Sequence, residues 1–572
     1  MNIFKKYELL VKEGLENKEK KKYFLIGTFV AFILSVMMLY PTKLVLAKML
    51  PGKNSDTFTI YVDLPSGSSI TQTKEVTECI TRYIQYEHEV TDTETFLGMG
   101  SALDFAGLMK GSQFKDGENL AEIVVNLTKK HHRGEPSYLM VQRMRPEVQL
   151  NCEAIYPGTS IKFVEPPAGP PTLAAIVAEI YGNDQQGIWK LAERVEEIFK
   201  QTEGLVDIDI MREEIYDRID LKVNSTKIAR SGLDIKQVND IIYLAFEGMD
   251  IAVKNSDDVY EQIPIFLTLS KGTKFFTGSD VRSVETKLSS LRLMNHNGML
   301  VPITEVINVL PSKSNPMITT KNLHQMVNVV AETDMVSQVY PLVEARAMIM
   351  NELAAEYNIT TSGLFNLDLV NIESGQHYKL LWDGEMEVTL DTFVDLGGAF
   401  IAALILIFLL MVVYYKSFVL SGIVLLGSFL SIIGVIFGHL IMDVFTSDTF
   451  FLTATSLIGF IALIGISSRN SLLLIDFTKS LMVDKGMHKT EAIAYASATR
   501  AKPIFLTATA IILASTLLAS DAVFGGLGVA LIFGTIAAVV ASLVVVPILL
   551  HNADLEKHFN FKERTVVSAY EP

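Results

Sequence analysis

One arginine stands inside an apolar segment of this sequence. The run from Phe450 to Phe477 is long enough to cross a bilayer, and it contains Arg469 followed at once by Asn470. An ionised side chain in hydrocarbon costs at least about 2.5–3.5 kcal/mol on insertion scales. Arg469 therefore either reaches the membrane surface or faces a group that needs a positive charge. The structural alternative is a guanidinium hydrogen-bonded to backbone carbonyls.

Composition indicates a membrane domain joined to large water-soluble domains. The 572 residues are 49% hydrophobic, and the mean hydropathy is +0.32. The net charge of −15 and the lack of a basic groove pattern argue against a nucleic-acid role. Two cysteines exclude a disulfide scaffold and a Cys-based zinc site. No nucleotide loop, metal motif or nucleophile motif stands out, so we expect neither an enzyme nor a cofactor.

The hydropathy pattern predicts six membrane helices around one large polar region. The helices are expected at about 23–42, 391–414, 418–442, 449–477, 503–520 and 524–550. The first apolar run lacks a small-residue cleavage site, so we expect a membrane helix and not a signal peptide. One helix, a polar region of roughly 350 residues and then five helices is a specific layout.

Lysine and arginine set the expected orientation. Seven lysines precede the first helix. The same side carries Lys416, Lys479, Lys485, Lys489, Arg500 and Lys502. The alternate loops, 442–449 and 520–526, have acids and neither lysine nor arginine. By the positive-inside rule, both termini are cytoplasmic in a bacterial inner membrane, and the large region is periplasmic.

The expected domains follow from this orientation. They are a cytoplasmic segment (1–22), the first membrane helix (23–42), a periplasmic region (43–390), a five-helix membrane domain (391–551) and a cytoplasmic tail (552–572).

The periplasmic region is predicted to be α+β. Strands at 57–64, 120–128 and 161–167 and helices at 70–87 and 137–155 form a first β-α-β-β-α-β unit. A second unit has strands at 174–182, 205–213 and 326–334 and helices at 185–202 and 337–357. A sub-domain at about 217–312 interrupts it, with a strand at 220–233 leading to a helix at 234–248. The repeated units indicate a duplicated ferredoxin-like domain.

Several motifs resemble those of the resistance–nodulation–division (RND) superfamily of transporters. They are LPSG (64–67), GPP (169–171), NSTKIARSGLDIKQVNDII (224–242), VPITEV (301–306), WDGEMEVTLDTFVDLGGAF (382–400), IGFIALIGISSRNSLLLIDF (458–477) and TRAKPIFLT (499–507). The resemblance covers nearly the whole chain and is to the C-terminal half of a twelve-helix transporter. It implies a trimeric efflux transporter driven by proton antiport, with small molecules expelled from the periplasm or the membrane.

The resemblance also implies a proton relay. One half of the family's members supplies aspartates, and the other supplies a cation on its fourth helix and a hydroxyl on its fifth. Arg469 and Thr507 match these positions. Arg469 lies seven residues before Asp476, and Thr507 lies seven residues after Arg500. Both are then roughly 10 Å from the cytoplasmic ends of their expected helices, so antiparallel neighbours would bring them level.

Arginine is effectively always charged, so Arg469 cannot carry the transported proton. We expect a fixed counter-charge that lowers the pKa of a carboxylate. This chain has no Asp or Glu between Gly397 and Met442, between Phe450 and Ile475, or between Pro503 and Ser520. We therefore expect a split transporter. A separate chain, the N-terminal half, would carry the intramembrane aspartates, and the assembly would be a trimer of heterodimers.

Plainer interpretations stand beside these. Thr507 could be a small helix-packing residue, and Asn470 could orient Arg469 or simply pack. Arg500 fits a topology anchor, although the resemblance leaves room for a role in proton entry. Asp476 fits a marker of the cytoplasmic boundary, and His439 fits a buried or interfacial histidine.

The resemblance also implies partners. The sub-domain at 217–312 would face a periplasmic adaptor or an outer-membrane channel. Segments 160–180 and 310–335 would contribute to a substrate cleft, in which we name no binding residue.

Metal and disulfide chemistry complete the candidates. Heavy-metal members hold copper or silver with methionines, but Val62 stands where the first is expected, and 120–127 lacks the second. MVSQV (335–339) resembles metal-exporter sequence and also fits a helix start. The loop KKHHRGE (129–135) fits a solvated loop. Cys79 and Cys152, on the two helices of the first unit, could form a disulfide in an oxidising periplasm or remain small buried side chains.

Three other functions compete with an efflux half-subunit. A SecD/SecF-like protein-export accessory has six helices and a periplasmic domain, but GPP and VPITEV fit it less well. A heavy-metal RND exporter is the second. A non-transporting scaffold is the third, and it would not need an intramembrane charge.

Overall fold

The computed structural model describes residues 3–102, 105–166, 169–257, 259–260, 262–274, 280–334, 337–446, 449–521 and 523–559. Part of the 335–339 segment and most of the expected tail therefore lie outside the described residues. The chain forms two compact units. The first comprises Met1–Leu64, Ser69–Met211 and Thr319–Pro572, and the second comprises Pro65–Ser68 and Arg212–Ile318.

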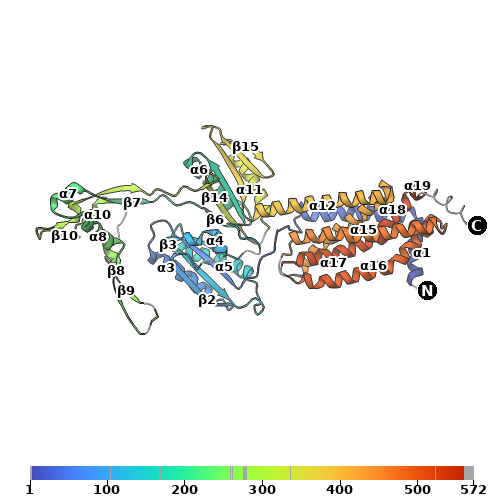
Figure 1. Cartoon of the computed structure of the whole chain (residues 1–572), viewed down its shortest axis with the longest axis horizontal. Coiled ribbons are helices and arrows are strands. Elements are labelled where there is room, and N and C mark those ends of the chain that lie inside the picture. The colour runs from blue at the N-terminus through green and yellow to red at the C-terminus, as the bar shows by residue number, and fades with distance from the viewer. Residues whose placement is uncertain are drawn as a thin grey trace, which may run out of the picture. The chain divides into compact units, whose positions relative to one another are not determined.

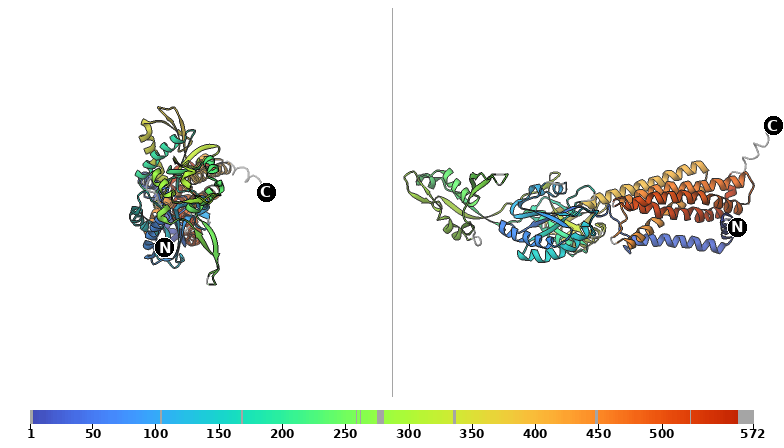
Figure 2. Two further views of the ribbon diagram at one scale, coloured as in Figure 1. Left: turned by 90° about the vertical axis from the view of Figure 1, so that its left-hand side faces the viewer. Right: turned by 90° about the horizontal axis from the view of Figure 1, so that it is seen from below.

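Six helical segments in the described part of the chain are long and apolar enough to cross a membrane. They are α2 (Lys18–Leu39), α12 (Glu385–Tyr415), α13 with α14 (Phe418–Phe429 and Ser431–Phe445), α15 (Ala454–Val483), α16 (Lys489–Ala519), and α17 with α18 (Gly525–Val540 and Val546–Asn552). They run alongside one another (Figures 1 and 2). A Cβ on Gly434 would lie 2.3 Å from the Phe533 carbonyl oxygen, so α14 and α17 meet backbone to backbone.

The expected boundary between the fourth and fifth membrane helices is wrong. α15 continues to Val483, and α16 begins at Lys489. Arg500 and Lys502 therefore lie in a helix and not in a loop. Pro503, expected to open the fifth helix, lies inside it. Lysine and arginine are good helix formers, so the apolar pattern stops before the helix does.

A further helix, α1 (Ile3–Glu16), packs against α16. Leu15 is 1% exposed, the Phe4 and Tyr495 ring centroids lie 5.9 Å apart, and Lys12 pairs with Glu491 at 2.9 Å. From the sequence these residues were expected only to form a lysine-bearing cytoplasmic segment, because the lysines were interpreted as topology signals.

Pro547 explains how α1 is anchored. Proline has no N–H, so the carbonyl of Leu543, four residues earlier, loses its usual helical donor. The helix makes a π turn there, at Ala541–Val545. The Tyr7 hydroxyl donates to the Leu543 carbonyl at 3.0 Å and supplies the missing hydrogen bond.

The first sheet has four antiparallel strands in the order β2-β3-β1-β4. These are β1 (Thr57–Asp63), β2 (Val90–Met99), β3 (Asp116–Leu127) and β4 (Ser160–Val164). Helices α3 (Ile70–Gln85) and α5 (Ser137–Cys152) pack with the sheet in one apolar core, and a short α4 (Phe105–Lys110) precedes β3. Sequence analysis named no residues for β2, whose polar pattern hides it.

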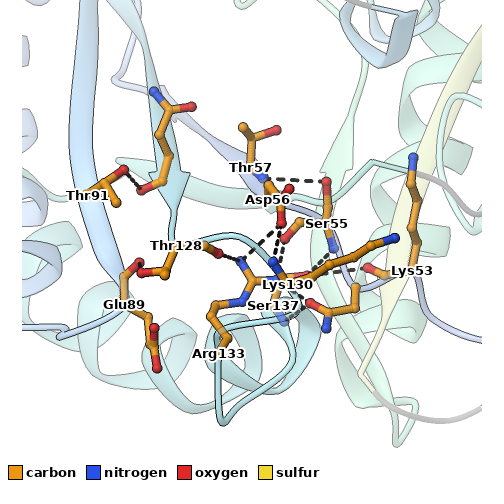
Figure 3. A network of polar contacts seen from close by, with 12 residues as sticks. Lys53, Ser55, Asp56, Thr57, Glu89, Thr91, Thr128, Lys130, Arg133 and Ser137 are labelled. Carbon is orange, nitrogen blue, oxygen red and sulfur yellow. Dashed lines mark hydrogen bonds and ion pairs between the residues drawn. The ribbon is translucent and has the colours of Figure 1, made fainter.

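The loop before α5 is tied to the chain leading into β1 (Figure 3). The Arg133 side chain is 0% exposed. It donates to the carbonyls of Thr128 at 2.9 Å and Ser55 at 2.7 Å. His131 and His132 are exposed, as a solvated loop requires, but Arg133 is a buried structural anchor within it.

The second sheet repeats the same strand order with a long insertion. Its strands are β5 (Ile176–Gly182), β6 (Leu205–Ile210), β13 (Thr320–Lys321), β14 (His324–Thr333), β15 (Tyr357–Ser362), β16 (Asn366–Asn371) and β17 (His377–Asp383). The order β6-β14-β5-β17 is antiparallel throughout, with β16 and β15 beyond β17. Helices α6 (Gln185–Gln201) and α11 (Val339–Glu352) share its core. Sequence analysis missed β15, β16 and β17.

The second compact unit is the insertion between β6 and β14. It contains β7 (Asp217–Val223), α7 (Ser225–Ser231), α8 (Ile235–Phe246), β8 (Met249–Lys254), β9 (Ile263–Leu267), α9 (Lys271–Lys274), α10 (Val281–Leu288), β10 (Arg292–Met294), β11 (Leu300–Pro302) and β12 (Ile307–Lys313). The strand expected at 220–233 is wrong beyond Val223. Asn224 caps α7, its Oδ1 accepting from the Lys227 amide at 3.1 Å, and Gly232 ends the helix at φ +67°.

Cys79 of α3 and Cys152 at the end of α5 form a disulfide, with 5.8 Å between their Cα atoms. That separation is usual for bonded cysteines. Disulfides persist in oxidising compartments, so the bond also bears on which side of the membrane this domain occupies.

We expect both thiols to be bonded in the protein taken from its native membrane. The intact mass after alkylation under denaturing conditions should show no adduct without reductant and two adducts with it. Two adducts before reduction would contradict the disulfide.

Candidate functional site

Arg469 lies on an exposed stripe of α15. Ile458, Ala462, Gly465, Arg469 and Leu473 follow one another three or four residues apart, and all five are exposed in the chain. A Cβ on Gly465 would meet nothing within 4 Å. Neighbouring positions, such as Ser467 and Asn470, are buried. The described residues thus leave one face of this apolar helix uncovered, with a permanent cation in it.

Arg469 makes no hydrogen bond or ion pair with any described residue, so the alternative of backbone carbonyl partners finds no support in these contacts. Asn470 lies on a buried face of α15 and is 7% exposed. Its side chain makes no hydrogen bond to Arg469 in the described structure.

Thr507 is also exposed, on α16. Its hydroxyl lies 3.1 Å from the carbonyl of Pro503 and 3.0 Å from that of Ile504, so it is held by its own helix. The Arg500 guanidinium carbon lies 5.1 Å from the centroid of the Phe477 ring, which fixes the relative height of the two helices. Arg469 precedes Phe477 by about 12 Å and Thr507 follows Arg500 by about 10 Å of helical rise, so the two lie level.

The remaining sequence candidates lie elsewhere. Arg500 is half-buried beside Phe477, and its Nε has no hydrogen-bond partner among the described residues. Asp476 accepts from the Tyr414 hydroxyl at 3.0 Å. His439 is fully buried, with one ring nitrogen 2.8 Å from the Val435 carbonyl and the other 2.8 Å from the Ser456 hydroxyl. The structure therefore groups Arg469 with Thr507 by height and exposure, and it separates Asn470 and Arg500 from them.

A cavity of about 140 Å³ lies between the two large sheets, beside the start of α12. The segments expected to contribute to a substrate cleft, 160–180 and 310–335, both reach it. It is lined by Lys48–Lys53, Lys110, Arg145, Phe163, Glu165, Pro166, Gly169–Thr172, Ala174, Ala175, Glu332, Thr333, Glu385 and Val388.

Charged groups dominate this cavity. Lys110 pairs with Glu332 at 2.8 Å and donates to the Leu173 carbonyl at 2.9 Å. Glu165 follows β4, and its Oε1 is buried without a hydrogen-bond partner among the described residues. Burial raises the pKa of the Glu165 carboxyl to about 7, against the opposing effect of Arg145. Glu165 was not predicted as a candidate, because nothing in the segment VEPP (164–167) indicates that this acid is buried.

The profile of the AcrB/AcrD/AcrF family matches residues 2–553. The chain belongs to this family of RND efflux transporters.

Relatives of this family member are distant and longer. It is 23% identical over 375 residues to the swarming motility protein SwrC of Bacillus subtilis, which covers 64% of this chain and 32% of SwrC. The multidrug resistance protein MdtF of Escherichia coli is 21% identical over 522 residues, covering 87% of this chain and 44% of MdtF. The chain thus spans less than half the length of these relatives.

A solved structure of a heavy metal efflux pump shares the fold. Its TM-score is 0.70 at 18% identity, and the match covers 97% of this chain and 52% of the pump. The cobalt-zinc-cadmium resistance protein CzcA of Cupriavidus metallidurans is 22% identical over 341 residues, 58% of this chain and 28% of CzcA. The efflux family therefore holds both multidrug and metal relatives of this chain.

We expect Glu165→Gln to remove a pH dependence from the stability of the region that contains the two large sheets. The folded pKa of about 7 exceeds the ordinary value of 4.5, so the stability that Glu165 contributes is present below about 4.5 and lost as pH rises through 7. Glutamine resembles the protonated acid and does not titrate. Relative to wild type, the variant should therefore become more stable as pH rises from 5 to 8.

The chain's two tryptophans, Trp189 in α6 and Trp382 in β17, both report on the second sheet that borders the cavity. Their fluorescence during unfolding at several pH values measures this effect. Parallel stability profiles of wild type and variant would contradict the prediction.

Proposed function

We propose that this chain acts as one half of a proton-driven RND exporter, in which Arg469 faces a carboxylate supplied by the other half. The observation that carries the proposal is the exposed, unpartnered Arg469 on an apolar helix. Lipid is a poor neighbour for this charge, because intramembrane arginines face a protein interior or a water-filled cavity almost without exception. We therefore expect membrane helices of a second protein to pack on the uncovered stripe.

The partner group is an acid. An opposite charge within about 4–6 Å lowers a carboxylate pKa by about 1–3 pH units. Because Arg469 keeps its proton, the carboxylate is the group that binds and releases the transported proton. Thr507, level with Arg469 and exposed on the next helix, offers a hydroxyl beside that carboxylate. Asn470 and Arg500 contribute indirectly, through helix packing and at the end of the bundle.

The partner is an N-terminal-half RND chain with aspartates on a membrane helix, in a trimer of heterodimers. The membrane is the bacterial inner membrane, with both termini cytoplasmic and the large domain periplasmic. The inserted unit would dock to a periplasmic adaptor and an outer-membrane channel. The two sheets with one strand order support the ferredoxin-like interpretation of the periplasmic domain.

The cargo is a small molecule taken from the periplasm or the membrane, through the cleft where 160–180 and 310–335 meet. Export of a metal ion is the second candidate, since the metal resistance protein CzcA is among the relatives. Growth of cells in metal salts and in small-molecule toxicants, compared between wild type and Arg469→Ala, distinguishes the two: lost tolerance to metal salts alone would favour a metal cargo.

Purification from the native membrane in mild detergent should bring down a stoichiometric partner with intramembrane aspartates. In that complex, Arg469→Ala should raise the pKa of the partner carboxylate by about 1–3 pH units, and Arg469→Lys should largely restore it. Infrared difference spectra of the carboxyl band measure this pKa. Proton-driven export should decrease in the variant in which the pKa is raised.

Lys502→Ala is the matched control, since it removes an exposed cation from α16 without touching the stripe. A homo-oligomer without an acidic partner, or an unchanged carboxyl titration in Arg469→Ala, would overturn the shared relay.

A further inference from the structure

The outer edge of β4 is occupied by side chains and not by another strand. Among the described strands, β4 pairs only with β1. The Ile161 amide donates to Glu153 Oε1 at 2.9 Å, and the Phe163 amide donates to Asp207 Oδ2 at 3.0 Å. Gln149 Nε2 donates to the Ile161 carbonyl at 2.7 Å. Two carboxylates thus replace a neighbouring strand, which satisfies an edge that would otherwise be open.

The two carboxylates come from different places. Glu153 directly follows α5, in the same β-α-β-β-α-β unit as β4. Asp207 lies in β6, at the edge of the second sheet. Its φ of +51° is a left-handed conformation that non-glycine residues rarely adopt. Such a conformation persists only where the surroundings hold it, and it often marks a functional site.

The surroundings of Asp207 are polar and buried. Its side chain is 1% exposed, and its carboxylate lies 3.3 Å from the Nε of Arg145. Gln149 Nε2 donates to its other oxygen at 2.9 Å. Arg145 and Gln149 both belong to α5, which packs on the first sheet. The side-chain groups that contact the Asp207 carboxylate therefore lie across the junction between the two sheets.

Three further contacts cross the same junction. Arg145 also pairs with Asp334 at 3.2 Å, and Gln142 donates to Asp334 at 2.8 Å. Lys162 of β4 pairs with Asp209 of β6 and, at 3.0 Å, with Asp63 of its own sheet. Polar contacts, rather than a shared apolar core, therefore join the two sheets at this edge.

The cavity between the sheets is too small for most cargo. Its volume of about 140 Å³ is below the roughly 300–1,000 Å³ of sites for drug-sized ligands. Arg145 and Phe163, which hold Asp207, also line it. Separation of the two sheets would widen this cavity, and it would break the contacts of Asp207.

We propose that Asp207, with Arg145 and the Phe163 amide, is a latch that keeps the cavity between the two sheets closed and opens when cargo enters. This role rests on the proposed transport function, but the closing contacts themselves can be tested without any cargo.

The test is the rate at which N-ethylmaleimide labels a cysteine placed in the cavity by Ala175→Cys, in the full chain with its native partners. Ala175 lines the cavity and is 5% exposed. Asp207→Gly should raise the labelling rate at least tenfold, because glycine adopts the left-handed conformation freely and only the carboxylate is lost. Asp207→Asn, which keeps one acceptor but loses the charge, should be intermediate.

Glu153→Ala is the matched control, because it also uncaps the outer edge of β4 but removes no contact between the sheets. Hydrogen exchange should quicken at Ile161 in this control and at Phe163 in Asp207→Gly. Equal labelling rates in the two variants, or a rate in Asp207→Gly equal to wild type, would overturn the latch. If Arg469→Ala leaves the carboxyl titration unchanged while the labelling rates still differ, the proton relay fails and the latch stands.

Discussion

A permanent positive charge on an otherwise apolar helix face is the constraint on which the membrane domain depends. Arg469 has no acid at its height in this chain, and its stripe of small and apolar residues lies uncovered. The helices behind that stripe pack tightly, with glycine against backbone between α14 and α17. The described helices are thus closely packed between α14 and α17 and leave the charged face of α15 uncovered.

The two large sheets follow a different rule. Each large sheet has its own apolar core, while the junction between them is polar. Lys110 with Glu332, Arg145 with Asp207 and Asp334, and Lys162 with Asp209 all reach from one sheet to the other. Removing one member of the buried pair of Arg145 and Asp207 is costly. The pairs need no tight apolar fit to re-form. Such a junction can open and close while both cores stay intact.

The sequence was sufficient where one signal dominates. Apolar length located the six membrane helices, and strand alternation located β1, β3 and β5. It failed where the signal lies in tertiary contacts. The first half of α16 was not predicted, because Pro503 and the charged residues before it interrupt the apolar pattern. Strands β15 to β17 were not predicted, because they are short and have polar faces. Arg469 was identifiable from its charge within an apolar run, and Thr507 from the family resemblance. The environments of Asp207 and Glu165 depend instead on burial and on contacts between separate segments of the chain.

The connection between β17 and α12 has a consequence for biosynthesis. β17 ends at Asp383 and α12 begins at Glu385, while Asp383 pairs with Val177 at the far end of β5. Domains fold as they emerge from the ribosome, N-terminal parts first. The first sheet can close once β4 has been made, but the second must wait for its last strand, immediately ahead of a membrane segment. Completion of this sheet is therefore timed to the insertion of the second membrane helix.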